Sequence, residues 1–147
     1  MTPLYVCGPY AGNDLDEIER NVCRAMALGE LALIRGYAPI VPHAAGWLGL
    51  FGPGQDDGGP SPQRERAVRC GSALASFVGA ARGQLWGILR DDLSTSAGCQ
   101  AEIEAWTTGY RDALHFTRIP AGALVLRTWA QWHDELEAVG IVVPVSL

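Results

Sequence analysis

The sequence predicts an α/β fold, a three-layer sandwich of the Rossmann or flavodoxin-like type with a five-stranded, mainly parallel sheet between helices. Three observations lead to this prediction. The 147 residues, 48% of them hydrophobic, are most simply one domain, 1–147, with a sizeable core. Short runs of β-forming residues alternate with long helical patterns. The first elements are a strand, a helix and a strand, an order that implies parallel strands joined by a right-handed crossover.

The first strand and helix are recognised by the residues at their ends. Residues 4–7 are β-forming and are stopped by a Gly-Pro pair. An Asn-Asp pair then supplies turn and cap residues before a helical pattern over about 14–34, which a glycine ends. Residues 38–41 predict the second strand. The apolar face of the helix consists of Ile18, Val22, Ala25, Leu28 and Leu31 or Ala32.

The middle of the chain changes in composition. Residues 42–62 are rich in Gly, Pro and Trp and have no periodic pattern, so we expect a mobile flap loop over a pocket. A helix is predicted over 64–77, and the apolar run 84–89 is predicted to be the third strand.

The last third of the chain predicts two helices and two strands. A helix begins near Ser96 and ends near Gly109, and residues 113–117 and 123–126 are expected to form the fourth and fifth strands. A final helix, 128–139, is capped by a threonine. The core-facing stripe of the first of these helices consists of Cys99, Ile103, Trp106 and Tyr110.

Charge and composition limit the classes of partner. A formal net charge of −5 without any basic cluster argues against nucleic-acid binding. A small anionic ligand is still compatible with this charge, because helix N-termini can hold phosphate. The four cysteines lack metal-ligand spacing, so we expect free thiols in a reducing cytoplasm and no metal. The absence of a charged leader and of a long apolar run predicts a soluble, cytoplasmic protein without a membrane partner.

The stretch 96–102 is predicted to start a helix just beyond the third strand, at the sheet edge where open α/β sheets bind ligands. Ser96 is a good N-cap, and Gly98 lets a ligand approach the backbone. The free N–H groups of the first turn suit an anion such as phosphate. Glu102 follows one turn later, so the spacing indicates an anion site beside a nucleophile. The alternative is a solvated helix glutamate.

Three motifs follow one another along the chain. Residues 5–12 combine a strand end with a glycine-containing loop, 39–43 combine a strand with a following histidine, and Ser96-x-Gly98-x-x-x-Glu102 is the third motif. Their order and spacing resemble the nucleoside 2-deoxyribosyltransferase superfamily, and most closely its branch of 2′-deoxynucleoside 5′-phosphate N-hydrolases. The resemblance covers about residues 1–110.

The resemblance implies an N-glycosidase that needs neither a metal nor an organic cofactor. Glu102 would attack C1′ of a (deoxy)nucleoside 5′-monophosphate, and water would then release the sugar 5-phosphate after the free base has left. Tyr5 would hydrogen-bond the nucleophile and hold its rotamer. The alternative for Tyr5 is an ordinary strand tyrosine.

The resemblance also implies which residues bind the nucleotide. The expected set is Gly8, Pro9, Tyr10, Gly12, His43, Asp91, Asp92, Ser96 and Gly98. Ser96 and Gly98 would hold the 5′-phosphate, because serine stands where the transferase branch has an acidic residue. The chain departs from the family in having Ala11 where the hydrolases have an arginine. Four arginines on neighbouring helices are candidates to replace it: Arg20, Arg24, Arg64 and Arg66.

Several of these side chains have a second interpretation. His43 would contact the base or relay a proton, or else be satisfied by the backbone. Asp91 and Asp92 would contact sugar hydroxyls, or else only form a turn. Trp47 and Phe51 would stack on the base, or else pack the flap against the core or a partner subunit.

Two rival functions stay open at this level. A nucleoside 2-deoxyribosyltransferase would use a second base in place of water, and a non-catalytic nucleotide-binding module would keep the crevice alone. In each case the partner is a nucleotide or nucleoside, and the resemblance implies a homodimer or higher homo-oligomer. The identity of the base, and the choice between ribose and deoxyribose, are not predicted.

Overall fold

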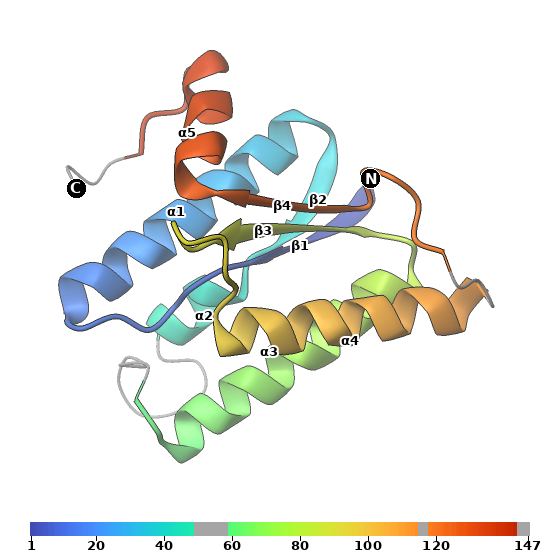
Figure 1. Ribbon diagram of the computed structural model, residues 1–147, viewed down its shortest axis with the longest axis horizontal. Coiled ribbons are helices and arrows are strands. Elements are labelled where there is room, and N and C mark those ends of the chain that lie inside the picture. The colour runs from blue at the N-terminus through green and yellow to red at the C-terminus, as the bar shows by residue number, and fades with distance from the viewer. Residues whose placement is uncertain (49–58, 115–117, 144–147) are drawn as a thin grey trace.

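The computed structural model describes residues 1–48, 59–114 and 118–143. Within them the chain is an α/β structure in which five helices cover a parallel sheet of four strands (Figure 1). The elements in chain order are β1 (Thr2–Cys7), α1 (Leu15–Ile34), β2 (Tyr37–Ile40), α2 (Pro42–Trp47), α3 (Pro62–Ala80), β3 (Gln84–Leu89), α4 (Ala97–Leu114), β4 (Leu124–Thr128) and α5 (Trp129–Ala138).

The sheet has the strand order β2-β1-β3-β4, and each neighbouring pair is parallel. Strand β1 is therefore central, and Tyr5 pairs with Ile40 of β2 on one side and with Leu85 of β3 on the other. Residues 4–7 have no solvent exposure. A central parallel strand is buried on both faces, which is why this segment is a continuous apolar run in the sequence.

Helices lie on both faces of the sheet. Leu4 and Val6 belong to a core shared with α1 and α5, whereas Tyr5 and Cys7 belong to a core shared with α3 and α4. Side chains alternate between the faces of a strand, so one short strand supplies both cores. Figure 1 shows α3 and α4 side by side on the second face. The Tyr5 side chain consequently points toward the helix that carries Glu102.

Two glycines allow α3 and α4 to pack closely. A Cβ atom on Gly79 would lie 2.2 Å from the carbonyl oxygen of Trp106, and one on Gly109 would lie 2.3 Å from that of Ser76. The indole of Trp106 is fully buried beside this crossing and donates to the Gly83 carbonyl at 3.1 Å. The backbones of the two helices therefore touch, which fixes where α4 carries its side chains.

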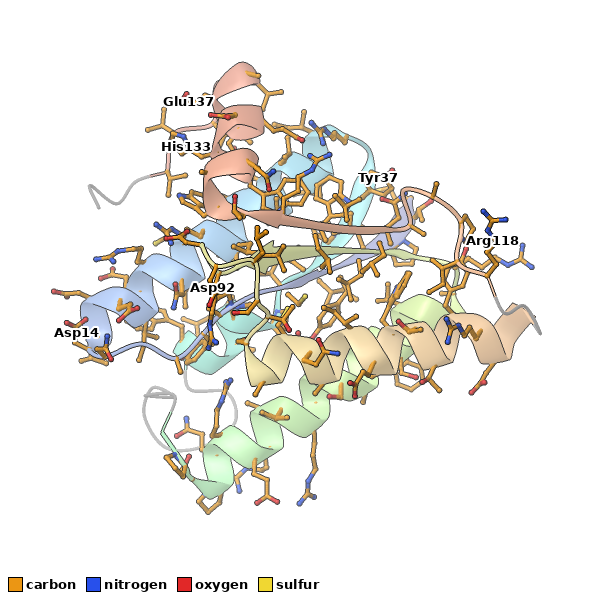
Figure 2. The ribbon with its side chains drawn as sticks, viewed as in Figure 1. Asp14, Tyr37, Asp92, Arg118, His133 and Glu137 are labelled. Atoms are coloured by element: carbon orange, nitrogen blue, oxygen red, sulfur yellow. The ribbon has the colours of Figure 1, made fainter. Side chains whose placement is uncertain are left out.

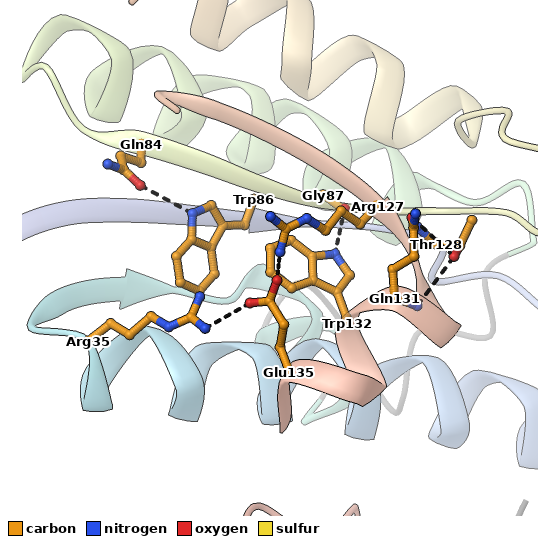
Figure 3. A network of polar contacts seen from close by, with 9 residues as sticks. All are labelled: Arg35, Gln84, Trp86, Gly87, Arg127, Thr128, Gln131, Trp132 and Glu135. Carbon is orange, nitrogen blue, oxygen red and sulfur yellow. Dashed lines mark hydrogen bonds and ion pairs between the residues drawn. The ribbon is translucent and has the colours of Figure 1, made fainter. Parts of the chain in front are cut away.

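Helix α5 is attached to the other face by aromatic and charged contacts (Figure 3). The Trp132 ring stacks on Trp86 with 5.2 Å between centroids, and its Nε1 donates to the Gly87 carbonyl at 2.9 Å. Glu135 lies between two guanidiniums, those of Arg35 and Arg127, and pairs with both.

The prediction of five strands was wrong by one within the described residues. Residues 113 and 114, expected in a strand, form the end of α4, and 115–117 lie outside the described residues. The helix does not end near Gly109. This glycine lies inside α4, where it allows the close contact with α3. The expected fifth strand is β4, and it extends to Thr128.

The predicted flap is also different at its start. Residues 42–47 form the helix α2, which begins with Pro42 at its first position, where proline's fixed backbone angle is favourable. Trp47 packs against the core residues Tyr10, Ile18 and Val22. Residues 49–58, which include Phe51, lie outside the described residues.

No helix in the part of the chain that the structure describes is both long and apolar enough to span a bilayer.

Candidate active site

The candidate site lies at the edge of the sheet where β1 and β3 end. Helix α1 connects β1 to β2 on one side of β1 in the sheet, whereas α3 leads to β3 on the other side of β1. The order in which strands are added to the sheet therefore reverses at β1, between β1 and β3. Such a switch point leaves a crevice at the carboxyl ends of the strands. Figure 2 labels Asp14 and Asp92 at this edge and Arg118 near the opposite end of the sheet.

Glu102 and Tyr5 meet beside Gly71 of α3. A Cβ atom placed on Gly71 would lie 2.8 Å from Glu102 Oε1 and 3.0 Å from the Tyr5 hydroxyl. The absence of a side chain at this glycine therefore provides the room in which the carboxylate and the phenol approach each other. Sequence reasoning missed Gly71, because a glycine inside a helix does not indicate what lies opposite it.

The environment of Glu102 opposes its ionisation. Burial raises the pKa of its carboxyl to about 7, and the nearby Tyr5 hydroxyl and Arg64 guanidinium lower it only in part. Burial, together with the charge of Glu102, holds the pKa of Tyr5 far above its usual value, so the phenol keeps its proton. Among the described residues, the buried Tyr5 hydroxyl has no hydrogen-bond partner of standard geometry. It influences Glu102 as a nearby dipole.

His43 supports the loop after β1. Its Nε2 lies 3.1 Å from the carbonyl oxygen of Gly8 and 3.2 Å from that of Pro9. Both partners are acceptors, so we assign the proton to Nε2, and Nδ1 is left as a buried acceptor without a partner among the described residues. Burial lowers the pKa of this imidazole to about 4. At pH 7 this ring is neutral, and its one N–H donates to backbone carbonyl oxygens. It is therefore poorly suited to relay a proton.

The loop itself is held by α1. The Asn21 amide donates to the carbonyl oxygens of Tyr10 at 3.2 Å and Ala11 at 3.3 Å. The Tyr10 ring is buried, and its centroid lies 6.0 Å from that of His43. Asn21 was not among the expected residues, since an asparagine on a helix face gives no sign that it fixes a distant loop.

One cavity is lined by five of the eleven predicted site residues, among them Glu102 and His43. Its volume is about 30 Å³, which is room for about one water molecule. A nucleotide therefore fits only if some lining side chains move. The cavity is lined by Gly8, Tyr10, Pro42, His43, Gly46, Arg64, Ala67, Val68, Gly98 and Glu102.

A second, larger cavity lies across the β1–α1 loop. Its volume is about 480 Å³, and its walls include three of the expected residues, Pro9, Gly12 and Asp91. Residues at the end of β3, side chains of α1 and Trp129 complete it. Asp91 therefore lines this second cavity and does not line the Glu102 cavity.

Asp92 and Ser96 have local structural contacts. The Asp92 carboxylate accepts from the backbone N–H of Ser94 at 2.9 Å and from its hydroxyl at 2.5 Å, and these bonds lower the pKa of Asp92. The Ser96 hydroxyl accepts from the backbone N–H of Cys99 at 3.2 Å, as an N-cap does. Neither residue is among those that line the two cavities described above.

A comparison with known families covers the elements that build the site. Residues 2–111, from β1 to the last turn of α4, match the family described as a domain of unknown function, DUF7768. The chain belongs to this family. No curated protein and no solved structure matches the chain.

The DUF7768 match includes Tyr5, His43 and Glu102 and every residue that lines the Glu102 cavity. Strand β4 and helix α5 lie beyond it. Within the described residues, one group of side chains has its potential metal-ligand atoms within 4.8 Å of one another: His133, Asp134 and Glu137 on α5. Figure 2 shows His133 and Glu137 on α5, which lies beyond the DUF7768 match and contributes no residue to the walls of the Glu102 cavity.

Two buried cysteines of this DUF7768 chain lie close to each other, where β1 ends and α4 begins. Cys7 Sγ, at the end of β1, is 2.8 Å from Cys99 Sγ in the first turn of α4, and both thiols are buried. The four cysteines, including Cys23 and Cys70, are free, as expected from the sequence. Burial, together with the neighbouring Cys99 thiol, raises the pKa of Cys7 well above its usual value, so this thiol stays protonated.

Proposed function

We propose that the chain hydrolyses the N-glycosidic bond of a (deoxy)nucleoside 5′-monophosphate through a covalent intermediate on Glu102. One observation carries the proposal: the Glu102 carboxylate, with a pKa raised to about 7, lies beside the Tyr5 hydroxyl in a cavity at the carboxyl ends of β1 and β3. Further support comes from the resemblance of three ordered motifs to 2′-deoxynucleoside 5′-phosphate N-hydrolases, and from a strand order that matches the start of the flavodoxin-like arrangement.

The reaction has two steps. In the first, a Glu102 oxygen bonds to C1′ while the C1′–N bond breaks, and the electron pair of that bond moves onto the base nitrogen, which takes a proton from solvent. In the second, water bonds to C1′, the electron pair of the C1′–O bond returns to Glu102, and the proton of the water is released. The products are the free base and the sugar 5-phosphate.

The raised pKa of Glu102 suits this role. A carboxylate with little hydration is a stronger nucleophile than a solvated one, and a pKa of about 7 leaves roughly half of the groups ionised at neutral pH. The Tyr5 dipole and the Arg64 charge favour the ionised form without cancelling the effect of burial. The loop 8–12 would hold the sugar, and the neutral Nδ1 of His43 would accept a hydrogen bond from the base.

The homo-oligomer implied by the resemblance is part of the same proposal. Its support is an apolar groove of about 650 Å³ along α1, near which Met26 and Leu33 are half-exposed. Light scattering measures the mass of the particle, and a mass near 15.7 kDa would remove the oligomer from the proposal.

The test is a screen for released base with the ribo- and deoxynucleoside 5′-monophosphates, each beside its dephosphorylated form. We expect release from a monophosphate, a loss of at least a thousand-fold in Glu102→Gln, and kcat/KM that rises with pH through about 7 as Glu102 ionises. The matched control is Glu104→Gln, which changes an exposed carboxylate of the same helix that accepts from the Gln100 amide. It should leave kcat/KM within twofold.

Each other outcome decides against a named part of the proposal. If a second free base is incorporated into a new nucleoside, the chain is a deoxyribosyltransferase. If the parent binds nucleotides and releases no base, it is a binding module. A Glu102→Gln variant with unchanged turnover would remove Glu102 from the mechanism.

A further inference from the structure

Arg64 reaches from α3 into the Glu102 cavity. It stands in the first turn of α3, where the Ser61 hydroxyl accepts from its backbone N–H at 3.0 Å. Its guanidinium carbon lies 5.1 Å from the centroid of the Tyr10 ring, a distance typical of a cation–π contact. A Cβ atom on Gly98 would lie 3.5 Å from Arg64 Nη2, so the guanidinium borders the first turn of α4.

Charges in the cavity are arranged on two sides. Among the described residues that line it, Arg64 is the one positively charged side chain at neutral pH, because His43 is neutral there, and Glu102 is the one acidic side chain. The carboxylate lies deep beside Tyr5, whereas the guanidinium lies over Tyr10 and Gly98. The Arg64 charge lowers the pKa of Glu102, but burial of the carboxyl has the larger effect.

The first turn of α4 adds a second positive feature next to Arg64. The leading N–H groups of a helix have no partner within the helix and form the positive end of its dipole. Gly98 exposes this backbone because it has no side chain. Guanidinium and helix terminus thus converge at one wall of the cavity, a combination that binds anions.

A buried polar atom without a partner among the described residues indicates that the cavity accepts a ligand. His43 is 5% exposed, and its Nδ1 has no partner among the described residues. Buried polar groups in native proteins are almost always paired, so the orphaned Nδ1 of a residue that lines the cavity indicates that a polar molecule binds there.

We infer that Arg64, together with the first turn of α4, binds the 5′-phosphate of the substrate and makes the site select a nucleotide over a nucleoside. The inference rests on the proposed function for the identity of the ligand. It assigns to α3 the cation that the sequence lacks at Ala11 in the β1–α1 loop. Arg64 is then a specificity-determining residue, because it contacts a group remote from the bond that breaks.

Calorimetry in the Glu102→Gln background tests this inference without turnover. The ligands are the four common deoxynucleoside 5′-monophosphates and the four matching deoxynucleosides. We expect Arg64→Ala to weaken binding of the preferred monophosphate about 10- to 100-fold, the loss typical of a charge-assisted contact, and to change nucleoside binding less than twofold. Arg64→Lys keeps the charge without the two-pronged geometry and should show an intermediate loss.

The matched control is Arg69→Ala on the same helix. Arg69 is highly exposed and pairs with Glu65, one turn away, at 3.0 Å, so its removal should leave the binding of both ligand classes unchanged. Thermal melting of each variant checks that it is folded.

Three results would overturn the inference: equal losses for nucleotide and nucleoside in Arg64→Ala, no loss in either, or no preference of the parent for the phosphorylated ligand. The proposed function fails separately. A phosphate preference that depends on Arg64, in a chain whose wild-type form releases no base, supports the inference and rejects the hydrolase.

Discussion

At Glu102 the fold keeps a carboxylate where burial disfavours its charge. The nearby Tyr5 hydroxyl compensates in part, and it is itself buried without a partner of standard geometry among the described residues. Groups that are costly to bury and poorly paired are typical of sites retained for function rather than for stability. At Tyr5 the requirements of stability and of function can be measured separately.

Tyr5→Phe should raise the stability of the folded protein and lower its catalytic activity at neutral pH. The variant loses a buried hydroxyl that has no partner of standard geometry among the described residues, so we expect the free energy of unfolding to rise by about 1 kcal/mol. It also loses a dipole that lowers the pKa of Glu102, so the rise of kcat/KM should move to higher pH. Urea unfolding and a pH–rate profile measure the two effects.

Tyr37→Phe serves as the control for this experiment. Tyr37 (labelled in Figure 2) lies on the edge strand β2, and its ring makes an edge contact with Trp86 in the core on the other face of the sheet from Tyr5. Its removal should leave the pH profile in place. A Tyr5→Phe profile identical to that of the parent would contradict the assigned role of the phenol.

At the scale of elements, sequence periodicity located nearly all the helices and strands. Their caps account for this success: Asp14 accepts from the backbone N–H of Glu17, and Thr128 forms a capping box with Gln131. The failures come from tertiary contacts. The sequence places the end of α4 near Gly109, whereas the helix continues to Leu114 and Gly109 allows the close packing of α3 on α4, which no local pattern encodes.

The site was predictable where it depended on strand ends and helix starts. Gly8, His43, Gly98 and Glu102 share one cavity because parallel strands end at the same edge. The sequence offered four candidate arginines and could not single out Arg64. The selection depends on which helix lies beside the cavity, and that is a tertiary property. Asp92 was expected at the site, but a loop aspartate forms a turn just as readily as it faces a ligand.

Gly79→Ala should destabilise the α3–α4 pair. Alanine has the higher helix propensity, yet its Cβ would lie 2.2 Å from the Trp106 carbonyl oxygen, and the helices must separate. We expect a loss of about 3 kcal/mol in the free energy of unfolding, measured by urea denaturation. The control Ala73→Gly, at an exposed position of α3, should cost only about 1 kcal/mol. A smaller loss in Gly79→Ala than in this control would contradict the close packing.

For the whole molecule, two buried groups of the site have opposite effects on the pH dependence of folding stability. The folded chain lowers the pKa of His43 from 6.5 to about 4, so it binds fewer protons than the unfolded chain in this range, and stability rises with pH. It raises the pKa of Glu102 from 4.5 to about 7, so it binds more protons there, and stability falls with pH. The two slopes nearly cancel between about pH 4.5 and 6.5.

Glu102→Gln should uncover the acid sensitivity of His43. Without the Glu102 titration, the variant should gain stability relative to the parent by about 3 kcal/mol as pH rises from 4.5 to 8. Chemical denaturation at a series of pH values measures this difference, and other carboxylates cancel because both proteins contain them. A difference that is constant with pH would show that Glu102 titrates alike in the folded and unfolded chains. Glu104→Gln is again the control.

The stacked tryptophans make the C-terminal part of the chain visible to spectroscopy. Trp86 lies on β3, within the DUF7768 match, whereas Trp132 lies on α5, beyond it, and their rings are inclined by only 28°. Indoles this close couple their electronic transitions, so the pair should give an exciton signal in circular dichroism. Loss of that signal would report undocking of α5 without any label, while the helix content stayed nearly constant.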